Sequence, residues 1–366
     1  DRGLGVNDDF KRLVAKFHEA GIRVVLDGVF NHVGRHFFAF EDVRQNRERS
    51  DKRNWFHIDF GGNTGYNDGF WYEGWEGHME LVKLNLGCEA VTDYLRRAVE
   101  FWLDEFAVDG LRLDVSYLLP EWFFEFLRRT VRLKRQDFFL MGEVIHNQNF
   151  AKNLSPERLD SITNYECYKG LTSALNADNL FEIEHSLERL FGPQPWCLYT
   201  GKNLFSFVDN HDVVRAYTAL SDKRKLPALY AILYSMPGIP CVYYGSEWGA
   251  EGDKSDNDYK LRPAVGELDR NRCPELTDLI RRLNGVRTRE RAFAYGSYDK
   301  CVLSNQYMCY KREWNGERIY CAFNISAGDV TVRVEEAEGT DLLTGEVRNL
   351  NDIYLPPFSV KLFKKH

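Results

Sequence analysis

Residues 109–115, Asp-Gly-Leu-Arg-Leu-Asp-Val, have the pattern of a strand that ends in charged side chains, and they indicate the type of fold more clearly than any other segment. Alternation along an extended strand sends Arg112 and Asp114 to one face and the leucines to the other. A guanidinium beside a carboxylate favours the ionised acid, so we expect Arg112 to lower the pKa of Asp114. Such a carboxylate at the carboxyl end of a parallel strand can act as a nucleophile or stabilise positive charge, whereas the alternative is a structural ion pair.

Three other apolar, β-rich stretches also end in a carboxylate, an amide or an imidazole, and each is followed by a helical pattern. These stretches are 22–30, which holds Asp27 and leads into Asn31 and His32; 138–144, which holds Glu143; and 204–208, which leads into His211 and Asp212. The carboxyl ends of the strands in a parallel barrel meet at one rim, where the active site lies. The pattern therefore predicts an α/β fold of the TIM (β/α)8 barrel type.

The chain resembles the α-amylase family of glycoside hydrolases and transglycosylases. Four family motifs follow one another in order: DGVFNH at 27–32, GLRLDV at 110–115, GEV at 142–144 and FVDNHD at 207–212. Weaker matches are PGIPCVYYGSEWG at 237–249 and VKLN at 82–85, of which VKLN is similar to the cyclomaltodextrinase and neopullulanase branch. The resemblance covers essentially the whole chain.

The resemblance implies a retaining glycosidase with Asp114 as nucleophile, Glu143 as general acid and base, and Asp212 as the carboxylate that stabilises the transition state. Such chemistry needs two carboxyl groups roughly 5 Å apart, one ionised and one protonated. Glu143 has apolar neighbours in sequence and no adjacent cation, so we expect its pKa to be raised. The other residues that the resemblance brings to the site are His32, Arg112 and His211, which would bind sugar, and Asp27 and Asn31, which would support the site from behind.

Residues 33–86 form a long insertion rich in aromatic side chains, and loops of this length are usually functional. Aromatic faces stack on the C–H faces of sugar rings. Trp71, Tyr72 and Trp75 are therefore predicted substrate-binding residues, and we expect one or two of them to face the cleft. The alternative is that most of the aromatics form the small core of the insertion.

The sequence departs from typical amylases after Asp114, where those enzymes carry a Lys-His pair that contacts starch and calcium. This chain has Val115–Leu118 there instead. We therefore expect no required cofactor and no metal site of that kind, although calcium stays open. Oxygen ligands for it would come from Asp59, Asn63, Asn67 and Asp68. The loop 61–69 has the composition of an exposed turn, which is the interpretation we favour.

The motifs divide the chain into four segments. They are 1–32, the first part of the barrel; 33–86, an inserted domain; 87–289, the remainder of the barrel; and 290–366, a C-terminal antiparallel β-sandwich of short alternating strands. Barrel strands three to eight are expected at 22–30, 109–115, 138–144, 160–165, 204–208 and 240–244. The opening residues resemble the segment after the family's second strand, so we expect an N-terminally incomplete barrel without strands one and two.

Composition narrows the classes of function. A chain of 366 residues with 44% hydrophobic residues can bury a sizeable core, and it contains no apolar run of membrane-spanning length. The net charge of −7 argues against nucleic acid as a partner. The eight cysteines show no metal-ligand spacing, which favours a reducing cytoplasm, with secretion left open.

These observations lead to one main hypothesis. We expect a retaining hydrolase of α-1,4-glucosidic bonds in maltooligosaccharides, cyclodextrins or related α-glucans, with the glucan as its partner and a homodimer left open. The alternatives are an α-glucan transglycosylase, in which a sugar hydroxyl replaces water, and a non-catalytic glucan-binding relative. The presence of all three carboxylates favours an enzyme.

Overall fold

A computed structural model describes residues 3–145, 150–255 and 257–366. The chain divides into two compact units, residues 1–162 and residues 163–366. The first unit is built on a four-stranded parallel sheet with the strand order β1-β7-β8-β9. Its strands are β1 (Val25–Gly28), β7 (Gly110–Leu113), β8 (Phe139–Gly142) and β9 (Ser161–Ile162). Because the strands are parallel, the residues that follow β7 and β8 emerge at the same edge of the sheet.

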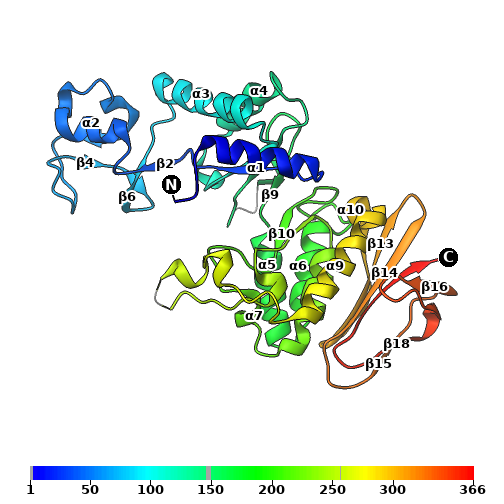
Figure 1. The fold of residues 1–366 in the computed structure, drawn as a ribbon. Helices are drawn as coiled ribbons and strands as arrows, with labels where there is room; N and C mark the ends of the chain where they lie inside the picture. Colours follow the sequence, from blue (N-terminus) through cyan, green and yellow to red (C-terminus); the bar gives the residue numbers. More distant parts are fainter. Residues whose placement is uncertain (1–2, 146–149, 256) are drawn as a thin grey trace. The chain divides into compact units, whose positions relative to one another are not determined.

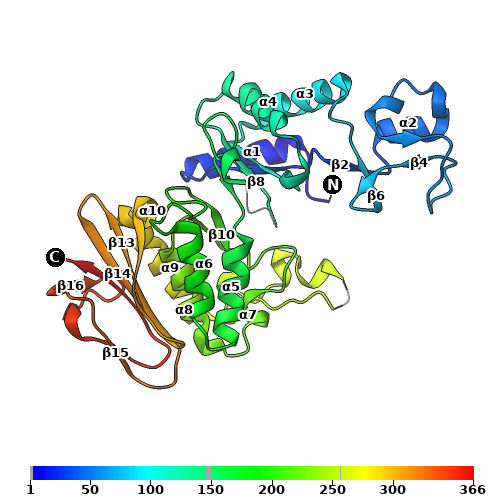
Figure 2. The ribbon, with the colours of Figure 1, turned by 180° about the vertical axis from the view of Figure 1, so that it is seen from behind.

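Three helices pack in sequence in this unit, α1 (Asn7–Glu19) on α3 (Glu89–Phe106) and α3 on α4 (Glu121–Arg132), as Figures 1 and 2 show from opposite sides. Helix α3 buries a stripe of apolar residues four apart, from Val91 to Leu103, which is the pattern of a helix with one core face. The helix ends at Ala107, whose left-handed backbone (φ 54°) turns the chain towards β7. A short turn, η3 (Ser116–Leu118), follows β7.

The insertion after β1 contains two small antiparallel sheets, β2-β6-β5 and β3-β4. Its elements are β2 (His32–Gly34), α2 (Phe38–Asn46), η1 (Arg47–Arg49), η2 (Arg53–Trp55), β3 (Ile58–Asp59), β4 (Trp71–Tyr72), β5 (Gly74–Trp75) and β6 (His78–Lys83). Phe40, Phe70 and Tyr72 are fully buried, and their rings contact one another. For these three residues the interpretation as a core of the insertion is confirmed.

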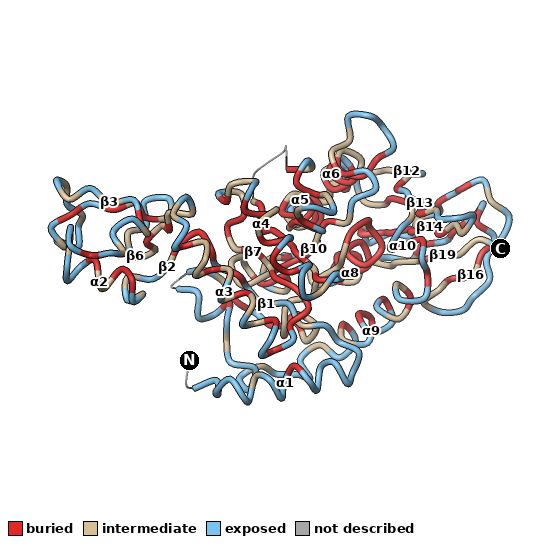
Figure 3. The backbone as a smooth tube through the Cα atoms, turned by 90° about the horizontal axis from the view of Figure 1, so that it is seen from above, coloured by how far each residue is buried: buried red, intermediate tan, exposed pale blue. Residues whose placement is uncertain are grey.

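The second unit contains the parallel pair β10 (Phe205–Phe207) and β11 (Ile239–Cys241), and Thr163 forms a parallel bridge to Phe205. Its helices include α5 (Tyr165–Asn176), α6 (Phe181–Phe191), α7 (Ala216–Ala219), α8 (Leu226–Ser235), α9 (Pro274–Arg289) and α10 (Arg291–Tyr295). Helix α8 is apolar on all sides and almost wholly buried, which Figure 3 shows in contrast to the exposed α1. It is the centre of this unit's core.

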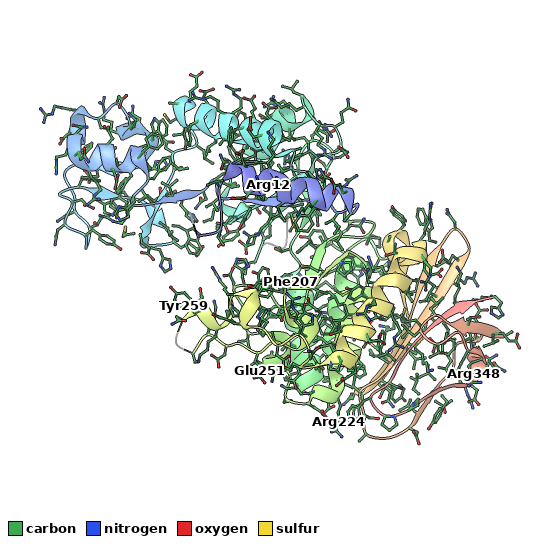
Figure 4. All side chains as sticks on the ribbon, in the orientation of Figure 1. Arg12, Phe207, Arg224, Glu251, Tyr259 and Arg348 are labelled. Atoms are coloured by element: carbon green, nitrogen blue, oxygen red, sulfur yellow. The ribbon has the colours of Figure 1, made fainter. Side chains whose placement is uncertain are left out.

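Two loops of the second unit carry short turns. The segment between β10 and α8 includes η5 (Lys223–Lys225), and the long loop between β11 and α9 includes η6 (Ser246–Trp248), η7 (Asp258–Lys260) and η8 (Val265–Glu267). Tyr259 projects from the second loop and is 81% exposed (Figure 4). An exposed aromatic ring of this kind is available to a ligand.

The C-terminal region is antiparallel β-structure, as predicted. A six-stranded sheet with the order β12-β13-β14-β19-β16-β17 lies beside the two-stranded sheet β15-β18. The strands are β12 (Ser297–Leu303), β13 (Tyr307–Trp314), β14 (Glu317–Asn324), β15 (Val330–Val332), β16 (Glu338–Asp341), β17 (Val347–Asn349), β18 (Ile353–Leu355) and β19 (Val360–Lys365). Tyr320 and Phe363 from the large sheet share one hydrophobic core with Val332 and Ile353 from the small one.

Five of the six predicted barrel-strand segments contain a strand and the sixth, 240–244, overlaps β11, which begins one residue earlier; each strand is shorter than its prediction. The ends of an apolar run are therefore poorer guides to a strand's limits than its centre. No helix in the described ranges is both long and apolar enough to cross a membrane.

Candidate active site

Arg112 draws three carboxylates together where β1, β7 and β8 end. Its guanidinium lies 2.7 Å from Asp27 Oδ1, 3.0 Å from Asp114 Oδ1 and 2.8 Å from Glu143 Oε1. The β1–β7 register places Asp27 directly beside Arg112. Although burial disfavours the charge, the carboxylates of Glu143, Asp27 and Asp114 hold the pKa of Arg112 above its ordinary value. Arg112 contacts all three acids, so its charge is divided among them.

The pKa of Asp114 depends on more groups than the neighbouring Arg112. Burial and the charges of Glu143 and Asp27 together raise the pKa of Asp114 to about 6, against the lowering effect of Arg112. In the sequence, only Asp114 lies close to Arg112. The two additional carboxylates lie in or directly after strands that are far from it along the chain but neighbours in the sheet. The prediction that Arg112 lowers this pKa is confirmed, but burial and the two other carboxylates outweigh its effect.

Glu143 has no cation beside it in sequence, but the structure brings one to it from a neighbouring strand. Arg112 reaches it across the β7–β8 pair, and Glu143 is buried, with 5% of its surface exposed. Its second oxygen, Oε2, accepts the backbone N–H of Val115 at 3.2 Å. Glu143 therefore contacts two donors that lie far from it in sequence, and its apolar neighbours along the chain were a poor guide to its surroundings.

The backbone at Val115 explains how the chain reaches Glu143. Val115 has a left-handed conformation (φ 46°), which a β-branched residue rarely adopts and which costs about 1–3 kcal/mol. Ser116 then donates to the carbonyl of Glu143 from its N–H at 3.1 Å and from its hydroxyl at 2.7 Å. Gly142 is required here because a Cβ at this position would lie 2.4 Å from Ser116 Oγ. These contacts lock the segment after β7 to the segment after β8.

His32 lies beside the same group. Its Nε2 is 4.0 Å from Asp114 Oδ2, and its Nδ1 accepts from Asn31 Nδ2 at 3.2 Å, which leaves the Nε2 proton directed towards Asp114. Burial lowers the pKa of His32, so the neutral ring is favoured. Asn31 is buried and its carbonyl accepts the N–H of Leu84 at 2.9 Å, which fastens the His32 segment to the end of β6.

The three predicted sugar-binding aromatics have different surroundings. Trp75 lies with its ring 5.8 Å from that of His32, and Trp71 is 39% exposed on β4. Tyr72 is fully buried, and its hydroxyl donates to the carbonyl of Met79 at 2.8 Å. Because Tyr72 has no face open to a ligand, its prediction as a substrate-binding residue is wrong.

Tyr117 is a neighbour of the site that the sequence marks only as a departure from the amylase pattern. Its hydroxyl donates to Glu76 Oε1 at 3.3 Å, next to Trp75 on the β5–β6 hairpin. Burial and the charge of Glu76 raise the pKa of Tyr117 to about 12, so it stays a neutral donor. The contact connects the segment after Asp114 to the insertion.

The oxygen-rich loop around residues 59–68 is held by internal contacts. Asp68 pairs with Arg35 at 2.9 Å and with Arg44 at 3.0 Å, and Asn63 donates to Asn67 at 3.1 Å. Asp59 Oδ1 accepts the N–H of Gly61 at 2.8 Å, as in a turn closed by its own side chain. These partners fit the interpretation of the loop as a turn.

In the second unit, Asp212 has a partner on each oxygen. Oδ2 lies 3.1 Å from His211 Nε2, and Oδ1 accepts from Arg262 at 2.7 Å. Arg262 also donates to the carbonyl of His211 at 3.1 Å, so the long loop after β11 is tied to the segment after β10. This contact of Arg262 with Asp212 is not visible in the sequence, because the two residues lie 50 positions apart.

A buried polar network supports the same segment. Asp209 accepts the N–H of Ala216 at 2.8 Å and the hydroxyl of Ser246 at 2.6 Å, and burial raises the pKa of Asp209. Arg215, which is fully buried, donates to the carbonyls of Tyr244 at 2.6 Å and Leu261 at 2.7 Å. The network fixes both ends of the β11 loop against the chain that carries Asp212.

The sequence of the chain matches that of a known protein family. The profile described as "Alpha amylase, catalytic domain" matches residues 1–276. The chain belongs to the α-amylase family. The family assigns it a TIM-barrel catalytic domain with a C-terminal β-sheet, and its relatives indicate the cyclomaltodextrinase-like branch.

Three relatives illustrate the similarity. A cyclomaltodextrinase of a Bacillus species is 33% identical over 270 residues, covering 69% of this chain and 45% of the relative. The cyclomaltodextrinase of Geobacillus thermopakistaniensis is 28% identical over 385 residues, covering 99% of this chain and 63% of the relative. A solved structure of a cyclomaltodextrinase is 27% identical with a TM-score of 0.86, covering 100% of this chain and 64% of its own. The chain thus spans about half to two thirds of the length of these relatives.

Proposed function

We propose that this α-amylase family member is a retaining glycoside hydrolase that cleaves α-1,4-glucosidic bonds of maltooligosaccharides, cyclodextrins or related α-glucans. The single observation that carries the proposal is the cluster of Asp114, Glu143 and Asp27 around Arg112, at the strand ends where this family of enzymes is expected to hold its site. The names of the cyclomaltodextrinase relatives support a cyclic or short α-glucan as substrate.

The proposed reaction has two displacements. Asp114 attacks the anomeric carbon as the bond to the leaving oxygen breaks, and Glu143 gives that oxygen its proton. Water, which loses a proton to Glu143, then attacks the same carbon and releases Asp114. Asp212 stabilises the positive charge that develops on the sugar ring, and His32 and His211 donate to sugar hydroxyls.

Arg112 has a positioning role in this proposal. It contacts both reacting carboxylates and is itself held by Asp27, whose two oxygens lie 2.7 and 2.8 Å from one guanidinium nitrogen. Because the pKa of Asp114 is about 6, this nucleophile is mostly ionised at neutral pH. The shared cation makes the ionisation of Asp114 a property of the cluster rather than of one residue.

For substrate binding we propose Trp75, which lies next to His32, and Trp71, which is exposed. We propose residues 33–86 as an inserted domain between two barrel segments, 1–32 and 87–289, and residues 290–366 as the C-terminal domain. A homodimer and a cytoplasmic location stay predictions of the sequence.

The proposal is tested by incubating the chain with maltohexaose, β-cyclodextrin and pullulan beside its Asp114→Asn variant, with products followed by chromatography and by NMR of the anomeric proton. We expect turnover that the variant lacks, and new reducing ends that appear first in the α configuration. Products longer than the substrate would favour the transglycosylase instead. Initial β products, or equal activity of the variant, would contradict the proposal.

A further inference from the structure

A bulge in the C-terminal sheet places two thiols opposite each other. Strands β12 and β13 pair Lys300 with Tyr310 and Val302 with Cys309, so Cys301 is an extra residue in β12. In a β-bulge, two consecutive residues of one strand oppose a single residue of its partner. Cys301 and Val302 therefore both oppose Cys309.

The surroundings of the two thiols are different. Cys301 is exposed on β12, which is an edge strand of the sheet, whereas Cys309 is 1% exposed and belongs to the core that the two C-terminal sheets share. All eight cysteines of the chain are described, and all are free thiols. An accessible thiol beside a buried one is the arrangement of an attacking and a resolving cysteine.

The thiol that peroxide can reach is also the more acidic one. A hydrogen bond from the Cys309 thiol and the charge of Lys311 hold the pKa of Cys301 below its ordinary value, against the effect of burial. The contact with Cys301 and burial raise the pKa of Cys309 well above its ordinary value. Thiolate is the reactive form of cysteine, so Cys301 is the group that reacts first.

We propose that Cys301 and Cys309 form an oxidant-sensitive disulfide site on the C-terminal sheet, separate from the proposed glycosidase activity. The oxidant is a hydroperoxide such as hydrogen peroxide. The Cys301 thiolate attacks one peroxide oxygen, the O–O bond breaks and hydroxide leaves, which gives a sulfenic acid. Cys309 then attacks the Cys301 sulfur, the S–S bond forms and the S–O bond breaks. Two thiols and one peroxide thus give one disulfide and two waters.

The strand geometry admits this bond. Opposed residues of antiparallel strands have Cα atoms about 4.5–5.5 Å apart, which lies within the range of about 4.4–6.8 Å seen for disulfides. Cys321, the other buried thiol of this sheet, is paired with Tyr310 rather than with Cys309. Since neighbouring residues of a strand point to opposite faces, Cys321 faces away from Cys309 and does not compete for Cys301.

The test uses the full chain, treated with hydrogen peroxide, then unfolded in guanidinium chloride with N-ethylmaleimide present so that buried thiols also react, and digested with trypsin without reduction. Trypsin cuts after Lys300 and Lys311, so one peptide, residues 301–311, carries both thiols. We expect this peptide to lack both maleimide groups and to be lighter than the dithiol by two hydrogens. Reduction before alkylation should restore both maleimide groups.

Two variants sharpen the test. Cys301→Ser changes an exposed residue and should keep Cys309 fully alkylatable after peroxide, with an unchanged melting temperature. Cys273→Ser removes a partly exposed thiol outside this sheet and should leave the disulfide yield as in the unmodified chain. A peptide 301–311 that keeps both maleimide groups, a sulfinic acid on Cys301 with Cys309 still free, or a bond from Cys301 to another cysteine would overturn the proposal.

Discussion

Arg112 and Arg312 are both largely withdrawn from solvent, but their guanidinium groups have different partners. Arg112 contacts three carboxylates at the ends of the parallel strands. Arg312, on β13, donates to the backbone carbonyls of Ser235, Phe293, Gly296 and Ser297 at 2.5–3.2 Å. Burial lowers the pKa of Arg312 to about 10, whereas the surrounding acids hold the pKa of Arg112 above its ordinary value.

This difference in partners identifies Arg312 as a structural cation and Arg112 as a functional one. The carbonyls around Arg312 come from the end of α8, from α10 and from the residues that lead into β12, so this arginine joins elements that otherwise end in unpaired acceptors. Arg112 instead holds together acids that repel one another, and a fold gains little stability from such an arrangement. Clusters of this kind are characteristic of catalytic sites. We therefore expect substitutions around Arg112 to affect rate and substitutions around Arg312 to affect stability.

Asp114→Asn is expected to have the largest effect. Loss of the attacking carboxylate should lower kcat on maltohexaose by on the order of 10³-fold or more, because removal of a nucleophile eliminates the covalent route. Asp27→Asn is the matched control, since it contacts the same guanidinium without reacting, and it should cost far less. Comparable losses in the two variants, measured by initial rates, would mean that the cluster is structural.

Arg112→Met should follow, with a loss in kcat of roughly 10²- to 10³-fold, since the reacting carboxylates lose the cation that orients them. Because the clustered carboxylates lose their shared cation, its melting temperature should also fall at pH 7, and should fall less at a pH at which the acids are protonated. The comparison is made by measuring kcat and thermal unfolding on the same preparation. A variant that unfolds at a much lower temperature yet keeps its rate per folded molecule would show that Arg112, like Arg312, has a structural role.

Arg312→Met should behave in the opposite way. The substitution removes the donor to four carbonyls, of which those of Ser235 and Phe293 are in buried hydrogen bonds, and we expect this to cost about 2–4 kcal/mol of unfolding free energy. Urea unfolding followed by circular dichroism would measure this loss. The kcat of the remaining folded protein should stay within about twofold of the unmodified chain, as for most substitutions remote from a site.

The pH dependence tests the character of Asp114 directly. Its pKa rises from an ordinary 3.8 to about 6 on folding, so kcat/KM should fall about tenfold per pH unit below 6. The same shift means that folding favours the protonated acid. Its contribution to stability is complete below pH 3.8 and is lost as the pH rises through 6. Asp114→Asn should therefore melt at a higher temperature than the unmodified chain at pH 7 and at nearly the same temperature at pH 3.8. An unchanged difference between the two pH values would contradict the raised pKa.

Arg262→Met should have the smallest effect. Its ion pair with Asp212 is half-exposed, and such pairs contribute roughly 0.2–1 kcal/mol, which corresponds to at most about a fivefold change in kcat/KM. Arg272→Met provides a control, because Arg272 pairs with Glu251 in the same loop without contacting Asp212. Equal changes for the two variants would show that loop order, rather than the contact with Asp212, sets the rate.

Much of the fold could be predicted because apolar runs that end in polar residues are visible along the chain. The same runs located Asp114, Glu143 and His32, which the structure brings close to one guanidinium or to one another. The contact between Arg112 and Glu143 was not predicted, because it depends on which strands are neighbours and on their register. No pattern of residue types along one strand contains that information.

Two further features also needed the structure. Tyr72 and Trp71 are adjacent in a sequence that favours sugar binding equally for both, but alternation in β4 buries the first ring and exposes the second. Val115 reads as an ordinary strand residue, whereas the contacts of the surrounding chain hold it in a left-handed conformation. In both cases long-range packing decides what local preference leaves open.

The most direct test of the central claim is to trap the glycosyl-enzyme intermediate with a slowly released 5-fluoroglycosyl fluoride of the α-gluco series and to map the adduct by mass spectrometry. We expect one hexosyl group on the peptide that contains Asp114, and none on the peptide that contains Asp27 or on the one that contains Glu143. Turnover of the reagent with no adduct on Asp114, or an adduct on another residue, would contradict it.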